Sequence, residues 1–186
     1  YPDPAANRNV KNILVEHCFL WNAEPGNAVE IGYEVRCDEI SDITFRDLDI
    51  VHCQYEGNQS GGVLTIHNAD RAYIHNIVYE YIRVEDAQEK FIDIKVLDSK
   101  YSLDRSRGRV EDIFFRNIEI LNGNFPVSIV RGFEMHTEMS RPQNIHFDNV
   151  VVLGEQINSP SDLHMVVELS NDIWFNGKDR VKRNPF

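Results

Sequence analysis

The chain has 186 residues, 42% of them hydrophobic, and a formal net charge of −11 at pH 7. This length fits a single domain that can bury a continuous core. The hydrophobic residues form no long apolar run, so we expect no membrane span. Phosphate binding needs a basic face, and the acidic balance therefore argues against a nucleic-acid partner.

The three cysteines, Cys18, Cys37 and Cys53, follow no metal-ligand spacing, and we expect no metal and no other cofactor. Cys18 occupies an inward position of the repeat described below. The sequence does not decide whether Cys37 and Cys53 form a disulfide. The sequence enters its first repeat soon after Tyr1, without a signal peptide or an amphipathic capping helix. We therefore expect a mature domain or the C-terminal part of a longer chain.

One motif recurs five times along the chain. It begins with Asn or Asp, and apolar residues follow at positions 1, 3, 6 and 8 after it. The copies are Asn12–Leu20, Asp42–Ile50, Asn76–Val84, Asp112–Ile120 and Asn144–Val152. Their leading isoleucines are 30, 34, 36 and 32 residues apart. A motif that recurs at such a period is typical of a solenoid.

Each motif predicts a strand, a tight corner and a second strand. Positions 1 and 3 alternate as in a strand with one buried face, and the alternation slips by one residue before positions 6 and 8. A residue in a left-handed or bulged conformation would produce this slip. The slip residues are His17, Asp47, Tyr81, Asn117 and Asn149. The residues expected to stack inward are Ile13, Val15, Ile43, Phe45, Ile77, Tyr79, Ile113, Phe115, Ile145 and Phe147.

A further strand follows each motif after a loop of variable length. These strands are predicted at 27–34, 62–67, 91–96, 127–131 and 164–169. Three short strands in each turn of about 30 residues, with no amphipathic helix between them, predict an all-β parallel β-solenoid. We expect about five to six coils within one domain, residues 1–186. A leucine-rich repeat has a shorter period and a Leu/Asn consensus that is absent here.

The segments Phe19–Asn22, Ala28–Gly32 and Ile43–Ile50 resemble right-handed parallel β-helix carbohydrate-active enzymes, most closely the polygalacturonase-like proteins of glycoside hydrolase family 28. The resemblance implies that the solenoid is a right-handed parallel β-helix. Residues 128–133 and 144–149 fit the late coils of such proteins. The resemblance implies action on a polysaccharide, in an extracellular or periplasmic location. The Asn-Thr-Asp, Asp-Asp, Gly-His-Gly and Arg-Ile-Lys motifs of polygalacturonases are not intact in this chain.

The later strands suggest where a site would lie. We align them on Ile31, Ile66, Ile94, Ile129 and Val167 as inward residues. One outward column then reads Glu30, Thr65, Asp93, Ser128, Val166, and the next reads Gly32, His67, Lys95, Val130, Glu168. Two coils separate Glu30 from Asp93, which places their backbones about 10 Å apart. Their carboxyl groups could then reach the separation of roughly 6.5–9.5 Å found in inverting glycosidases.

We expect Glu30 and Asp93 to be the acid and the base of this hydrolysis, and His67 and Lys95 to hold sugar oxygens in the same groove. Arg131 would bind a carboxylate or sugar hydroxyls at the edge of the groove. The same polar columns would also result from solvent exposure alone, and Lys95 beside Asp93 from a surface ion pair.

Two other functions stay open. The first is a non-catalytic carbohydrate-binding or structural β-helix, which the missing motifs and the short chain favour. The second is a polysaccharide lyase, which would need an acidic calcium site and a basic residue such as Lys95 or Arg131. Either tryptophan could stack on a sugar, but Trp21 ends an apolar strand and is expected to pack, whereas Trp174 is expected to close the C-terminal end.

Overall fold

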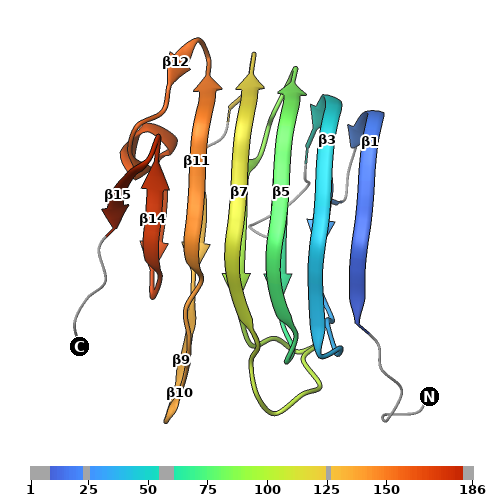
Figure 1. Ribbon diagram of the computed structural model, residues 1–186, viewed down its shortest axis with the longest axis vertical. Coiled ribbons are helices and arrows are strands. Elements are labelled where there is room, and N and C mark those ends of the chain that lie inside the picture. The colour runs from blue at the N-terminus through green and yellow to red at the C-terminus, as the bar shows by residue number, and fades with distance from the viewer. Residues whose placement is uncertain (1–8, 23–25, 55–60, 125–126, 182–186) are drawn as a thin grey trace.

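The computed structural model describes residues 9–22, 26–54, 61–124 and 127–181. These residues form an all-β solenoid of about four turns, built around two parallel sheets (Figure 1). In each turn, the chain passes through a long strand of one sheet and a short strand of the other. Equivalent residues of successive turns therefore lie side by side.

The long-stranded sheet has the order β1-β3-β5-β7-β11-β14-β15, with β12 paired to β11. Its strands are β1 (Val10–Asn22), β3 (Glu39–Cys53), β5 (Tyr73–Val84), β7 (Arg109–Ile120), β11 (Gln143–Val152), β12 (Glu155–Gln156), β14 (Asn171–Phe175) and β15 (Lys178–Val181). The short-stranded sheet has the order β13-β8-β6-β4-β2. Its strands are β2 (Val29–Ile31), β4 (Gly62–Asn68), β6 (Lys90–Val96), β8 (Ser128–Arg131) and β13 (Met165–Glu168). A hairpin, β9 (Phe133–Met135) and β10 (Glu138–Ser140), and a 3₁₀ helix, η1 (Pro160–Leu163), lie outside these sheets.

Ladders of like residues fill the core between the sheets. The leading isoleucines pair in the register Ile13, Ile43, Ile77, Ile113, Ile145, and Ile173 of β14 extends this ladder. Two positions later, the rings of Phe45, Tyr79, Phe115, Phe147 and Phe175 stack with centroids 4.8 to 5.1 Å apart. This separation is close to the spacing of neighbouring strands. The predicted inward register is confirmed for the strands from β3 to β11, whose ladder residues are all buried. On β1, the first strand of the sheet, Ile13 and Val15 pair in the same register, but Ile13 is 40% exposed, so it does not lie in the core as predicted.

The predicted corner within each motif is a left-handed residue. His17, Asp47, Tyr81, Asn117 and Asn149 have φ between 52° and 55°. The Asn or Asp that begins each motif is also left-handed, which the sequence analysis did not foresee. Both kinds of position favour Asn and Asp, which adopt positive φ more readily than most residues. The ladder continues on both sides of each corner, so every motif forms one bent strand instead of two separate ones.

The predicted register of β8 is wrong by one residue. Val130, not Ile129, pairs with Ile94, and Arg131 pairs with Lys95. Ser128 and Val130 are buried, although both were placed in outward columns. Apolar residues stand at both 129 and 130, so a two-residue period does not distinguish the two registers.

The cysteines and the helices give two shorter results. Cys18, Cys37 and Cys53 are all free thiols, so the structure does not contain a Cys37–Cys53 disulfide. Within the described residues, no helix is long and apolar enough to cross a membrane.

Candidate functional site

The neighbouring strands β2, β4 and β6 bring four of the five predicted site residues together. Glu30 pairs in register with Thr65 and Thr65 with Asp93, while His67 pairs with Lys95. Because the strands are parallel and adjacent, these side chains form two rows on the same face of the short-stranded sheet. We call Glu30, His67, Asp93 and Lys95 the charged cluster.

His67 lies between the two carboxylates of the charged cluster. Its Nδ1 is 2.9 Å from Glu30 Oε1, which is a hydrogen bond. Its Nε2 is 3.4 Å from Asp93 Oδ2, a longer contact that is mainly electrostatic. One imidazole ring therefore occupies the space between the carboxyl groups of Glu30 and Asp93.

Asp93 is the most enclosed member of the charged cluster, with an exposed fraction of 0%. Lys95 Nζ donates a hydrogen bond of 2.9 Å to Asp93 Oδ2. Lys90 Nζ lies 3.6 Å from the same oxygen and 3.5 Å from Glu89 Oε2. A buried carboxylate is tolerated only when it is paired, and these two lysines with His67 supply the pairing. The sequence analysis did not predict Lys90 as a partner of Asp93, although it lies only three residues before Asp93 in the chain.

Burial and neighbouring charges shift the pKa values of His67, Glu30 and Lys95. Burial alone would lower the pKa of His67, but hydrogen bonding and charge from Asp93 and Glu30 outweigh it and raise that pKa. Burial alone would raise the pKa of Glu30, but its hydrogen bonds to His67 and Asn27 lower it. Burial lowers the pKa of Lys95, against the opposing effect of Asp93. The lowered pKa of Glu30 and the raised pKa of His67 both favour the ion pair between these two side chains.

Backbone and amide contacts fix the position of Glu30. Asn27 Nδ2 donates to Glu30 Oε2 at 2.5 Å, and Asn27 Oδ1 accepts from the backbone N–H of Gly62 at 2.7 Å. Gly32 lets β2 approach β4 closely, because a Cβ there would lie 2.8 Å from the carbonyl oxygen of His67. Any larger residue at position 32 would push the two strands apart and displace Glu30 from His67.

His67 and Asp93 were expected to line an open groove, but both are buried. Tyr33 lies edge-on to His67 at 5.4 Å between centroids, and Tyr101 lies edge-on to Tyr33 at 6.3 Å. The exposed fraction is 29% for the side chain of Glu30 and 14% for that of Lys95. Solvent reaches the charged cluster mainly at Glu30.

Arg131, the fifth predicted site residue, extends the row that contains His67 and Lys95. It pairs in register with Lys95, yet its side chain forms an ion pair with Glu168 of β13, with Nε 2.6 Å from Oε2. The side chain of Arg131 is 44% exposed. Arg131 therefore lies at the border of the charged cluster, as predicted for an edge position, and its described ion pair holds it toward β13.

Trp21 does not pack as predicted. It is 70% exposed on β1, the last strand of its sheet, and its ring contacts His52 at 5.5 Å between centroids. Trp174 lies on β14, which pairs with β15 at the C-terminal end of the sheet, and its ring stacks on His146. The exposure of Trp21 follows from the absence of a described strand beyond β1.

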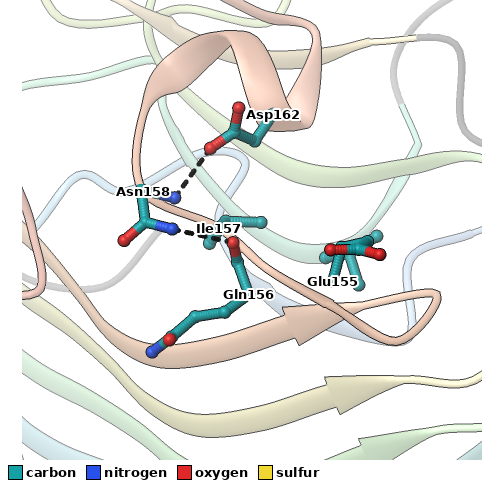
Figure 2. Close-up of a pocket in the computed structure, with 6 residues that line it drawn as sticks. Glu155, Gln156, Ile157, Asn158 and Asp162 are labelled. Atoms are coloured by element: carbon teal, nitrogen blue, oxygen red, sulfur yellow. Dashed lines mark hydrogen bonds between the residues drawn. The ribbon is translucent and has the colours of Figure 1, made fainter.

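A separate concavity of about 440 Å³ lies where the chain leaves β11, between β12 and η1 (Figure 2). The backbone N–H of Asn158 donates to Asp162 Oδ2 at 2.7 Å, and Asn158 Nδ2 donates to the carbonyl oxygen of Gln156 at 3.0 Å. Figure 2 shows Glu155 apart from these bonds. The polar groups of this concavity are used to shape their own loop, so we do not assign it a ligand.

No protein family, curated protein or solved structure matches this chain. Within the described ranges, no group of three or more His, Cys, Asp or Glu side chains is arranged to hold a metal ion. The functional proposal therefore depends on the geometry of the charged cluster.

Proposed function

We propose that this chain is a glycoside-hydrolase-like β-helix that acts on a polysaccharide. The observation that supports this proposal most is the part-exposed carboxylate of Glu30, which His67 orients and holds ionised. His67 is in turn oriented by the buried Asp93. A base positioned by a second group, which is positioned by a third, is a recurring arrangement of catalytic sites.

In this proposal Glu30 acts as the general base of an inverting hydrolysis. It takes a proton from water, whose oxygen bonds to the anomeric carbon on the face opposite the leaving sugar. Asp93 is buried and paired with Lys95 and Lys90, so we give it the role of holding His67. The proton for the leaving oxygen then comes from a donor outside Glu30, His67 and Asp93.

The finer features of the fold also belong to the proposal. We propose that the solenoid is right-handed, because connections between parallel strands of one sheet are right-handed in almost all proteins. We also propose five to six coils, because the repeated motif occurs five times in the sequence. Coils about 4.8 Å apart would present successive positions to an extended polymer along the short-stranded sheet. The proposed partner is a poly- or oligosaccharide, met outside the cytoplasm.

The test is the release of reducing ends from pectic and other plant polysaccharides by the purified protein. We expect Glu30→Gln to abolish this release, because the amide cannot accept the proton of the attacking water. Glu16→Gln is the matched control, since Glu16 is a carboxylate of the other sheet that pairs with Arg46. Thermal melts should show that both variants are folded at the assay temperature, with a lower midpoint for Glu30→Gln because the charge of Glu30 pairs with His67. Full activity of Glu30→Gln would rule out Glu30 as the base.

Non-catalytic carbohydrate binding is the second candidate function. It is favoured by the burial of His67 and Asp93 and by the ion pairs that engage each charge of the cluster. Under this alternative, a polysaccharide gel would retard the protein while no reducing ends appear. Arg131→Ala should then weaken the retardation, because Arg131 is the exposed cation at the border of the cluster. Cleavage by the unchanged protein would exclude this alternative.

A further inference from the structure

A groove crosses the outer face of the long-stranded sheet, on the other sheet from Glu30. It consists of two adjoining pockets of about 230 and 340 Å³, which share Glu111 and Gln143. Arg109 and Arg141 line the first pocket, and Trp174 lines the second. The groove runs across the first residues of β7, β11 and β14. In Figure 1 these strands begin at their lower ends, near the β9–β10 hairpin. We call it the outer groove.

An aromatic stack borders the outer groove. Phe114, His146 and Trp174 occupy equivalent positions of β7, β11 and β14. Their ring centroids are 5.1 and 5.8 Å apart, and the rings of His146 and Trp174 are within 3° of parallel. Trp174 Nε1 is buried, yet it has no hydrogen-bond partner among the described residues. Because solvent does not reach Nε1, we do not assign it a ligand, and Trp174 offers the groove the part-exposed surface of its ring.

Donors and acceptors alternate along the polar side of the outer groove. Gln143 Nε2 donates to Glu111 Oε2 at 2.7 Å, and Arg141 Nη1 lies 3.5 Å from Asn171 Oδ1. In the second pocket, Asn144 donates to Asp112 at 2.5 Å. Each of these groups has further hydrogen-bonding capacity, because amides, guanidinium groups and carboxylates form several hydrogen bonds.

The charge of the outer groove is nearly balanced. Two arginines face three carboxylates, those of Glu111, Asp112 and Asp172. An anionic ligand would need an excess of cations, and a cationic ligand would compete with the two guanidinium groups. A ligand with many hydroxyls can donate to the carboxylates and accept from the amides and arginines at the same time.

We propose that the outer groove binds a neutral oligosaccharide. One sugar ring packs against the part-exposed ring of Trp174, while its hydroxyls bind Gln143 and Arg141. This site is distinct from the charged cluster, and it would bind glycan whether or not Glu30 performs hydrolysis. A second site on the same rigid solenoid would hold a polymer near the first and raise its local concentration.

Tryptophan fluorescence offers a direct test, because the chain has two tryptophans. In a Trp21→Phe variant, all tryptophan emission comes from Trp174 when the excitation is selective for indole. We would titrate this variant with short neutral oligosaccharides from β-glucan, xylan and galactan, and confirm binding by calorimetry. At least one should change the emission of Trp174. Adding Gln143→Ala and Arg141→Ala should weaken binding about tenfold, the effect of roughly 1.4 kcal/mol.

The matched control is Arg83→Ala, which removes an arginine from the same sheet outside the outer groove. This control should leave the affinity unchanged. The proposal is overturned if none of these oligosaccharides produces heat or an emission change. It is also overturned if Glu30→Gln weakens binding while the groove variants do not.

Discussion

The two sheets of the solenoid use the same repeat differently. On the inward face of the long-stranded sheet, one residue type recurs from coil to coil, as in the ring ladder from Phe45 to Phe175. In the short-stranded sheet, the column that begins with Glu30 continues as Thr65, Asp93 and Ile129. The repeated residues of the long strands thus build the core ladder, and the candidate site lies in the short strands, where equivalent positions carry different residues.

The energetics of the two regions differ as well. Each ring of the ladder gains from burial and from contact with the rings above and below it, so the loss of one ring is a local loss. The charges of the cluster are stable only together, because each buried charge needs its partners. Changes in the ladder should therefore cost stability at every pH, whereas changes in the cluster should alter how stability depends on pH.

The largest expected effect is in the ladder. Phe115 is fully buried between Tyr79 and Phe147, at 4.9 and 4.8 Å between centroids. We expect Phe115→Ala to lower the free energy of unfolding by about 3–5 kcal/mol, through lost transfer energy and a cavity. Urea denaturation measures this. Phe114→Ala is the control, since its side chain is part-exposed on the opposite face and should cost clearly less. Equal losses would contradict the inward register.

An intermediate effect is expected from pH, through His67. Its pKa is raised in the folded protein, by Asp93 and Glu30 against the opposing effect of burial. A raised histidine pKa adds stability that is complete below the unfolded pKa of about 6.5 and is lost as the pH rises through the folded value. Glu30, whose pKa is lowered, adds stability above its unfolded pKa that is lost as the pH falls through the folded value.

Urea denaturation at a series of pH values would show this dependence. We expect stability to decrease as the pH rises above about 6.5, and this slope to be smaller in a His67→Gln variant. The groups that face His67 are Glu30 from β2, Asp93 and Lys95 from β6, and Tyr33. His17→Gln is the control, because its ring is 70% exposed at the corner of β1. An unchanged slope in His67→Gln would show that the cluster does not govern it.

Much of the ladder could be predicted because the chain carries its own internal comparison. Ile113 and Phe115 are read as inward since four other copies show the same spacing, and the corner at Asn117 follows from the slip. The short strands lack such a motif. At β8 two adjacent apolar residues, Ile129 and Val130, allow two registers, and a period of two cannot choose between them.

The candidate site was predicted in part, because the coils of a solenoid stack in register. Stacking at a fixed strand spacing is enough to bring Glu30, His67, Asp93 and Lys95 together. Burial was not predictable, because alternation identifies the outward face and does not tell what covers it. The outer groove was missed because Gln143 precedes the repeated motif. A partial sixth copy of the motif, Asp172–Phe175, places Trp174 beside His146, and the sequence analysis did not recognise it.

The smallest expected effect is a gain in stability within the ladder. Tyr79 is the one ring of the described ladder with a hydroxyl, and this hydroxyl is buried without a hydrogen-bond partner among the described residues. Burial raises the pKa of Tyr79, so the phenol stays neutral. An unsatisfied buried hydroxyl costs roughly 1–3 kcal/mol, and its removal leaves only a small void.

We therefore expect Tyr79→Phe to raise the free energy of unfolding by about 1 kcal/mol, seen as a higher urea midpoint. Tyr33→Phe is the matched control, because the hydroxyl of Tyr33 hydrogen-bonds to Ser99 and its loss should give no gain. A lower urea midpoint for Tyr79→Phe would mean that a water molecule or another polar group satisfies the hydroxyl. A higher midpoint would show that the ladder is more stable when all of its rings are apolar, whereas the charged cluster needs side chains of opposite charge.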